Sequence, residues 1–186
     1  WLLFMDKKIL DQQILTLFNS PFTKNKGFNL LVDSYKQPLY FQIRRILISH
    51  ESTNDVLQEV FIKCWNKLDS FNQQSKLSTW LYRIAYNESL QWMRKNDKHN
   101  SYSLDEINQN HTPSTSIFAK NADEISLILE KAVLSLPEKQ RIVFQYKYFE
   151  NLEYKEIQEI TGGSIGGLKA SYHHAVAKVK KYLTIN

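Results

Sequence analysis

Residues 55–95 form the sequence DVLQEVFIKCWNKLDSFNQQSKLSTWLYRIAYNESLQWMRK, and this stretch decides the fold. Its first part, up to Leu68, has apolar residues at steps of three and four, the period of a helix with one buried face. Its second part begins at Leu77 and runs to about Lys95 without Gly or Pro, and Ser78 or Thr79 can cap its first turn. The polar segment 69–76 between them predicts a loop. The sequence therefore predicts two amphipathic helices joined by a polar loop.

The second of these helices carries a polar, basic stripe along one side. Arginine and lysine supply charge for phosphates, Asn and Gln can pair with base edges, and aromatic faces can stack on an unpaired base. Such a stripe suits a nucleic acid whose strands are being parted. An ordinary charged surface helix whose aromatic residues pack in the core explains the same pattern. The residues of the stripe are Arg83, Asn87, Gln91, Arg94 and Lys95, with Trp80, Tyr82, Tyr86 and Trp92 as the aromatic residues.

Before this stretch, the chain predicts a short leading helix and a long amphipathic segment. Apolar residues at helical spacing in 9–18 predict the leading helix, which Asn19-Ser20-Pro21 ends. Residues 24–27 indicate a basic, flexible connector. The amphipathic segment then runs from Phe28 to Leu47, and we expect a kink or a new helix start near Gln37, because Pro38 lacks a backbone donor. Residues 49–54 predict a turn, in which Thr53 or Asn54 caps the next helix.

After Lys95 the composition changes to a polar segment with little periodicity, residues 97–121, which we interpret as a linker between two modules. A second helical block follows from Ala122, with a helix restart at Leu136-Pro137. The segment Asn151-Leu152-Glu153-Tyr154 then opens a third helix that runs through Ile160. Gly162-Gly163 breaks this helix, and Ser164 caps a last helix over 165–183. Two helices joined by a glycine-containing turn favour a helix-turn-helix, although similar hairpins occur in many all-α proteins.

Composition and charge narrow the class of protein. The chain has 186 residues, of which 42% are hydrophobic, enough to bury a core. Its net charge of +5 and pI near 9.1 suit a polyanionic partner. Residues 1–96 hold 13 Lys and Arg against 8 Asp and Glu, and residues 164–186 hold four lysines and no acid. A basic C-terminal end is what docking on phosphates requires.

The sequence carries no sign of catalysis, of a cofactor or of export. The single Cys64 lies on an apolar helical face, which favours a buried thiol in a reducing cytosol. No apolar run approaches the ~20 residues that span a bilayer, so we expect a cytoplasmic protein without membrane insertion, whose native start is Met5. The five histidines lack metal-ligand spacing, and neither a phosphate-binding glycine loop nor a Ser/His/Asp pattern is present. We therefore predict no enzyme, no cofactor and no metal site.

Several motifs resemble the extracytoplasmic-function (ECF) sigma factors, the compact branch of the sigma-70 family of bacterial transcription initiation factors. DVLQEVFIKCW, LDSF and SKLSTWLYRIAYN are similar to region 2 of that family. LPEKQRIVF, NLEYKEIQEITG and SIGGLKASYHHA are similar to region 4. The resemblance spans residues 28–183 and implies an all-α chain of two small helical domains joined by a flexible linker. The expected parts are a leader (1–27), a region 2-like domain (28–96), the linker (97–121) and a region 4-like helix-turn-helix domain (122–186).

The resemblance also implies partners and site residues. The expected partners are core RNA polymerase, through its β′ clamp helices and β flap, promoter DNA and an anti-sigma factor. The polymerase contact would be made by Asp55, Gln58 and Glu59, although a solvated face with a Glu59–Lys63 pair is the simpler alternative. The minus-ten DNA would be held by Phe71, Asn72, Gln73, Gln74, Ser75, Lys76, Trp80, Arg83, Asn87, Gln91 and Arg94.

Region 4 of the resembling family binds the minus-thirty-five promoter element. The corresponding residues here are Ser164, Gly167, Lys169, Ala170, Ser171, His174 and Lys178. Many relatives carry an arginine at the position of Ser171, so we expect a different or weaker base preference there. Two other classes of function remain open from the sequence: a helix-turn-helix regulator that acts without binding core polymerase, and an adaptor that binds polymerase but not DNA.

Overall fold

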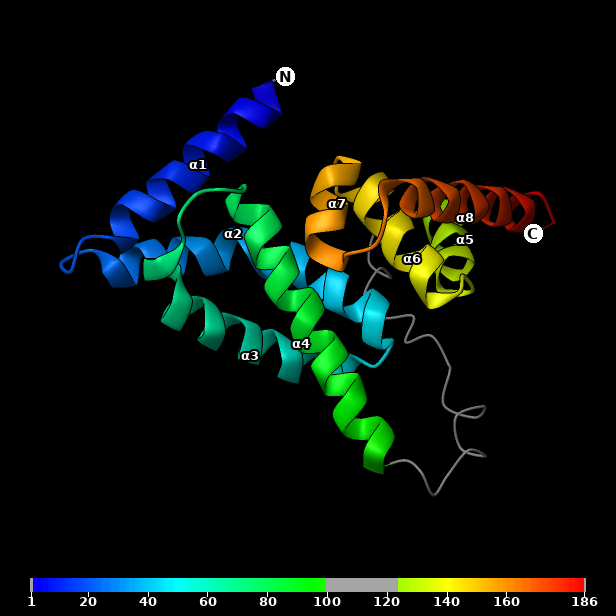
Figure 1. Cartoon of the computed structure of the whole chain (residues 1–186), viewed down its shortest axis with the longest axis horizontal. Coiled ribbons are helices and arrows are strands. Elements are labelled where there is room, and N and C mark those ends of the chain that lie inside the picture. The colour runs from blue at the N-terminus through cyan, green and yellow to red at the C-terminus, as the bar shows by residue number, and fades with distance from the viewer. Residues whose placement is uncertain (1, 100–123, 186) are drawn as a thin grey trace.

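The computed structural model describes residues 2–99 and 124–185 of the chain. All regular elements in these ranges are helical, as predicted (Figure 1). The first half contains α1, α2, α3 and α4, with a short 3-10 turn, η1, between the last two. The second half contains α5, α6, a π-helical segment η2, α7 and α8. The bounds in the first half are Leu2–Phe18 (α1), Lys24–Leu47 (α2), His50–Lys67 (α3), Leu68–Ser70 (η1) and Leu77–His99 (α4). Those in the second half are Glu124–Leu134 (α5), Glu138–Phe144 (α6), Gln145–Phe149 (η2), Tyr154–Thr161 (α7) and Ile165–Ile185 (α8).

The segment that we expected to be a flexible connector, residues 24–27, is the first turn of α2, so that prediction was wrong. Gly27 is helical and buried where α2 meets the end of α1. A Cβ atom on Gly27 would lie 2.5 Å from the backbone nitrogen of Phe18. The glycine therefore serves close helix packing rather than flexibility. Thr23 strengthens this corner, because its hydroxyl donates to the Leu17 carbonyl at 2.8 Å.

The proline in α2 does not start a new helix, in contrast to one of the two outcomes we expected. Pro38 lies inside α2, which runs from Lys24 to Leu47. Tyr35 and Leu39, on either side of the proline, are buried in the core, and this packing offsets the loss of one backbone hydrogen bond. The predicted turn at 49–54 was also misplaced. Ser49 is the N-cap of α3, and its side chain accepts a hydrogen bond from the Ser52 backbone.

The second half follows the predicted order, with different boundaries. Pro137 occupies the N-cap position of α6, one residue before the helix. The π-helical segment η2 was not predicted. The third helix begins at Tyr154, the last residue of the segment 151–154 predicted to open it. Asn151 has a left-handed φ of 51°, and Glu153 and Glu156 form a capping box at the helix start. Helix α4 reaches His99, beyond the end we predicted; residues 100–121 of the expected linker lie outside the described residues.

The two halves of the chain share one hydrophobic core. Its buried residues come from α1, α2, α3 and α4 and also from α6, α7 and the start of α8. A smaller cluster joins α5, α6 and α8. In Figure 1, α7 lies beside the first half of α4, and α6 lies to the right of α7, next to α8. The sequence left open whether the two modules pack together, and in this structure they do.

Polar side chains cross this interface at buried positions. The Gln42 side chain, on α2, donates to the Tyr82 carbonyl at 2.9 Å and to the Tyr146 hydroxyl at 2.5 Å. The Tyr82 hydroxyl in turn donates to Glu150. Burial raises the pKa of both tyrosines, so the two hydroxyls stay protonated. Arg141 adds a further link, because its Nε donates to the Arg45 carbonyl at 2.6 Å.

None of the described helices combines the length and apolarity that crossing a lipid bilayer requires.

Candidate polymerase and nucleic-acid interfaces

Helix α3 presents an acidic face to solvent. Asp55, Gln58 and Glu59 are exposed, while the opposite side of the helix is buried in the core. Lys63, which the simpler alternative pairs with Glu59, instead has its ammonium group 2.6 Å from the carboxylate of Glu88 on α4. The carboxylates of this face are thus left available to a basic partner. Ile62, one helical turn further along, is 54% exposed and gives the same face an apolar contact.

The loop between α3 and α4 combines one anchored aromatic ring with exposed amides. Phe71 is partly buried and packs against Trp80, with ring centroids 5.3 Å apart. Asn72, Gln73 and Gln74 are exposed, and Ser75 is half-buried. The loop is bent locally, because Gln73 adopts a left-handed φ of 57° and the Asn72 side chain accepts from the Gln74 backbone. The predicted loop residues lie together just before the first turn of α4.

At the end of this loop, Lys76 is tied to the second half of the chain. Its ammonium group lies 2.8 Å from the Glu156 carboxylate on α7. Burial alone would raise the pKa of the Glu156 carboxyl group. Several hydrogen bonds, first among them the one from Lys76, lower it by more, so the pKa lies below its ordinary value. At the other end of the loop, the Lys24 ammonium group lies 2.6 Å from Asp69. Ion pairs thus hold both ends of the loop.

The predicted stripe on α4 is exposed to solvent along its length. Arg83, Asn87, Gln91 and Arg94 are all exposed, whereas Leu81 and Ala85 on the opposite side are buried. A strand lying along this side of α4 would meet two guanidinium and two amide groups. Trp80, from the same set, is partly buried against the loop. The structure therefore brings the loop and the stripe into one continuous surface.

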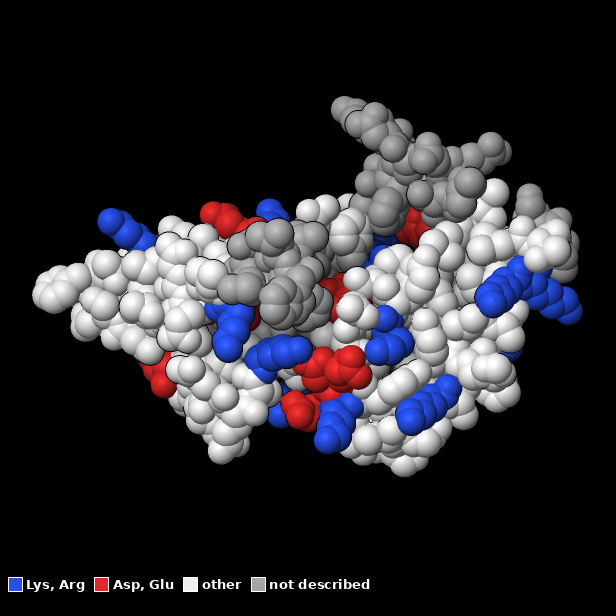
Figure 2. Space-filling view, turned by 90° about the horizontal axis from the view of Figure 1, so that it is seen from above, with Lys and Arg blue, Asp and Glu red and all other residues white. Residues whose placement is uncertain are grey.

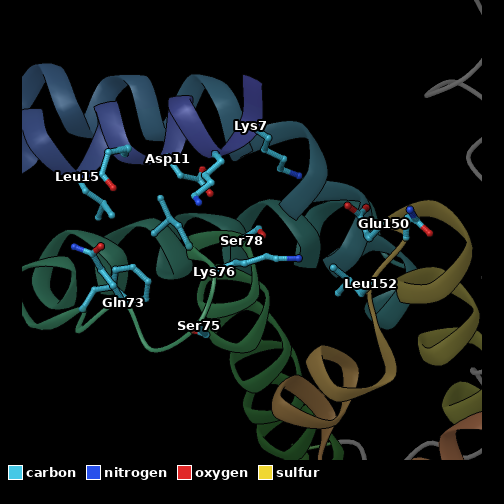
Figure 3. Close-up of a pocket in the computed structure, with 14 residues that line it drawn as sticks. Lys7, Asp11, Leu15, Gln73, Ser75, Lys76, Ser78, Glu150 and Leu152 are labelled. Carbon is cyan, nitrogen blue, oxygen red and sulfur yellow. The ribbon is translucent and has the colours of Figure 1, made fainter. Parts of the chain in front are cut away.

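A cavity of about 720 Å³ opens beside the loop, and the sequence did not predict it. Residues 71, 73, 75 and 76 of the loop form one side, together with residues 77 and 78 at the start of α4. Residues 150–152 before α7 form another. The third side is α1, a helix that we had assigned to a leader without a role. Figure 3 shows α1 above the cavity, with Asp11 and Leu15 pointing down towards the loop. The α1 residues that line the cavity are Lys7, Lys8, Asp11, Gln12 and Leu15.

Two acidic groups on this cavity are held by tyrosine hydroxyls. Asp11 accepts a hydrogen bond from Tyr35, and burial raises its pKa although that bond opposes the shift. Glu150 accepts from the hydroxyl of Tyr82. No sequence pattern pointed to α1 as part of a site, since its lysines and amides are spaced as on any surface helix. Only the packing of α1 over the loop reveals it.

Helices α7 and α8 form the predicted helix-turn-helix. Gly162 and Gly163 have φ values of 77° and 82°, which permit the sharp turn. The Ser164 hydroxyl then accepts from the Gly167 backbone at 3.1 Å, which confirms it as the cap of α8. Leu168 and Ala175 bury the inner side of the helix. On the outer side the predicted residues Ser164, Gly167, Lys169, Ala170, His174 and Lys178 are exposed, and Ser171 is half-buried.

Charge is distributed unevenly over the molecule. Figure 2 shows acidic and basic side chains intermixed near the middle of one face, whereas the end formed by α8, at the right, shows only basic ones. The sequence gives the same contrast, since residues 164–186 contain four lysines and no acid. Among the four lysines of residues 164–186, Lys178 and Lys180 are exposed on α8. This end of the molecule suits a polyanion.

Comparisons with known proteins agree with this arrangement. The model of sigma-70 region 2 matches residues 31–99, and that of sigma-70 region 4 matches residues 126–179. The chain is 34% identical over 168 residues to the ECF RNA polymerase sigma factor SigW of Bacillus subtilis (strain 168), covering 84% of this chain and 89% of that relative. It is 30% identical over 159 residues to the ECF RNA polymerase sigma-E factor of Escherichia coli (strain K12), covering 81% and 83%.

Two solved structures have a similar fold. One is the sigma factor RpoE in complex with the anti-sigma factor NepR from Bartonella quintana, with a TM-score of 0.73 at 24% identity over 87% of this chain and 99% of that one. The other is CnrH in complex with the cytosolic domain of CnrY, with a TM-score of 0.66 at 19% identity over 95% and 99%. Together with the region 2 and region 4 matches, the identity to curated relatives over most of both chains settles the family. This chain belongs to the sigma-70 family and is an ECF RNA polymerase sigma factor, a subunit that directs transcription initiation without a catalytic site of its own.

Proposed function

We propose that residues 28–96 work as the region 2 domain, which binds core polymerase and holds the opened minus-ten DNA, and that residues 122–186 work as the region 4 domain. Residues 97–121 then link the two domains. The observation that carries this proposal is the continuous surface of the loop and α4, in which exposed amides follow Phe71 and lead to Arg83 and Arg94. This surface offers a stacking ring, base-edge partners and cations in sequence along one strand.

Polymerase binding is assigned to the acidic face of α3. The β′ clamp helices that the family resemblance implies are rich in arginine, so Asp55 and Glu59 would guide docking by charge, with Gln58 and Ile62 in contact. We expect the double variant Asp55→Lys/Glu59→Lys to lose binding to core polymerase and to stay folded, because both side chains are exposed. The control Asp33→Lys/Glu159→Lys changes the charge equally at exposed sites elsewhere. Equal binding by both double variants would refute the assignment.

Strand opening is assigned to the loop and α4. Extruding a base costs a few kcal/mol, and stacking on an aromatic ring returns ~1–3 kcal/mol per base, so a pocket with phosphate contacts can tip a balanced opening step. The variant Asn72→Ala/Gln74→Ala removes two exposed amides and should bind polymerase normally but open promoters poorly. Permanganate reactivity of unpaired thymines measures the opening. The control Asn25→Ala/Asn29→Ala removes exposed amides on α2 and should open promoters like the parent.

Region 4 is assigned to the minus-thirty-five element and to the β flap. The exposed side of α8, from Ser164 to Lys178, would enter the major groove, as the second helix of a helix-turn-helix does. Alanine at Lys169 should then weaken binding to the upstream element without affecting strand opening on templates that lack it. An anti-sigma factor is a further expected partner, since both similar solved structures are described as complexes, one with an anti-sigma factor and one with the cytosolic domain of CnrY.

A further inference from the structure

Packing does not hold the turn between α7 and α8. Gly162 and Gly163 form this turn with left-handed φ values of 77° and 82°, and both are exposed. Apart from its own chain neighbours, a Cβ atom added to either glycine would meet none of the described atoms within 4 Å. Glycine has more backbone freedom to lose on folding than any other residue. Two consecutive glycines without packing neighbours therefore need hydrogen bonds to fix their conformation.

Gln158, in the last turn of α7, makes hydrogen bonds to both glycines. Its backbone carbonyl accepts from the Gly162 N–H at 2.8 Å, and its side-chain Nε2 donates to the Gly163 carbonyl at 2.7 Å. The Thr161 hydroxyl also lies 3.3 Å from the Gly162 carbonyl, but it is closer, at 2.8 Å, to the carbonyl of Ile157 in its own helix. The shorter side-chain hydrogen bond to the turn is therefore that of Gln158.

The carbonyl that Gln158 binds belongs to the peptide group that leads into α8. The nitrogen of this group is that of Ser164, whose hydroxyl accepts from the Gly167 N–H at 3.1 Å as the cap of α8. The Ser164 carbonyl accepts the next bond, from the Leu168 N–H at 3.0 Å. Because a peptide group is planar, fixing the Gly163 carbonyl also fixes the direction in which the chain enters α8.

The remainder of α8 is anchored independently of this bond. Leu168, Ala175 and Val179 are buried and hold the inner side of the helix. None of residues 164–167 is fully buried, and a Cβ atom added to Gly166 would meet no described atom within 4 Å beyond its chain neighbours. Loss of the Gln158 amide should therefore loosen the first turn of α8 and leave the helix from Leu168 onwards in place.

We propose that Gln158 is a positioning residue for promoter recognition. Its amide orients the first turn of α8, so that Ser164 and Gly167 meet defined base pairs at one end of the minus-thirty-five element, as the N-terminal residues of a recognition helix do. This inference rests on the proposed role of α8 in binding that element, and it adds a residue of α7 that the sequence did not single out. Because the hydrogen bond lies at the protein surface, its loss leaves the core of region 4 intact.

The test uses the full chain bound to core polymerase. The probe is a pool of duplex promoter DNA in which the upstream element is fully randomised, and the bound DNA is sequenced. Gln158→Met removes the donor but keeps the charge, the approximate length and the helix propensity of the side chain. It should flatten the base preference at one end of the element and keep it at the other. Affinity for the sequence that the parent prefers should fall by about 2- to 12-fold, the factor that corresponds to one net intramolecular hydrogen bond.

Three further variants separate positioning from stability and from charge. Gln13→Met makes the same change at an exposed site on α1 and should keep the parent preference. Tyr146→Phe removes a buried hydrogen bond with Gln42, away from the turn, so it should lower stability without altering base preference. Gln158→Lys supplies a new donor for the Gly163 carbonyl. It should recover the preference, while its charge raises affinity for all sequences alike.

The outcomes separate this inference from the proposed function. The inference is wrong if Gln158→Met keeps the parent preference at every position, if Tyr146→Phe flattens the same positions, or if Gln158→Lys is as flat as Gln158→Met. If the parent complex itself shows no base preference within the randomised element, the proposed role of region 4 fails, and this inference fails with it.

Discussion

Replacing Gly27 by alanine should destabilise the protein, even though alanine favours a helix. The new Cβ atom would lie 2.5 Å from the Phe18 nitrogen and 2.9 Å from the Leu17 carbonyl carbon. Carbon contacts are comfortable at about 3.5 Å, so α1 and α2 must separate by about 1 Å, and backbone atoms cannot rotate away. Overpacking of this kind costs about 1–3 kcal/mol, and the loosened contact of Phe18 with Trp65 adds up to about 1 kcal/mol.

Against this loss stands the gain of about 1 kcal/mol in helix propensity on changing Gly to Ala. The expected result is a net loss of up to about 3 kcal/mol in the free energy of unfolding, which urea denaturation followed by circular dichroism can measure. Gly166→Ala is the matched control, because a Cβ atom there meets nothing within 4 Å, and it should leave stability unchanged or raise it. If Gly27→Ala proved as stable as Gly166→Ala, the close packing of α1 on α2 would be refuted.

Three further predictions concern buried groups. Tyr146→Phe removes the hydroxyl that accepts from Gln42, and should lower the free energy of unfolding by about 0.5–1.5 kcal/mol in urea denaturation; no change would contradict the buried contact between the domains. The pKa of Glu156 is lowered in the folded state. Its pairing with Lys76 therefore stabilises the protein fully at pH values above the ordinary pKa of 4.5, and this stabilisation is lost as the pH falls through the folded-state pKa. The stability difference between the parent and Glu156→Gln should therefore shrink on acidification, and a difference independent of pH would argue against the pair. Burial raises the pKa of the Cys64 thiol to about 12, so this thiol should react with Ellman's reagent only when the protein unfolds.

Local patterns in the sequence were sufficient for much of the fold. The apolar spacing in 55–68 and 77–95 predicted α3 and α4, and the polar segment between them predicted the loop, because helix amphipathicity and loop composition are short-range signals. Ser164 was correctly predicted to cap α8, since the glycine turn before it marks the start of a helix. In each of these cases the deciding residues lie within one or two helical turns of each other.

The features that sequence reasoning missed depend on contacts distant in the chain. Gly27 looked like part of a connector, because a glycine that permits close helix packing cannot be distinguished from a flexible one without knowing its neighbour. Gln42 was not singled out from the sequence, because its partner Tyr146 lies 104 residues away. Ser49 was passed over as a cap in favour of Thr53 and Asn54, since all three are good capping residues and only the observed helix start separates them.

The candidate site could be predicted only where its residues lie close together in the sequence. The loop and the stripe on α4 are consecutive in sequence, and the structure places them on one surface. The wall that α1 supplies was not predicted, because Lys7 and Lys8 precede the loop by more than 60 residues and no motif marks them. The π-helical segment η2, which supplies Tyr146 to the interface, was also not predicted, since such segments have no distinctive residue pattern.

In the proposed function, the loop and α4 hold one strand of an opened promoter while α3 holds the polymerase. The most direct measurement mixes the purified protein with core polymerase and genomic DNA of the parent organism, and maps the start sites of the transcripts together with the unpaired thymines. We predict starts at sites that share an upstream element, each with an opened segment just before the start, and their loss with Asp55→Lys/Glu59→Lys. Transcripts that are absent with the parent protein, or that persist unchanged with that variant, would contradict the account.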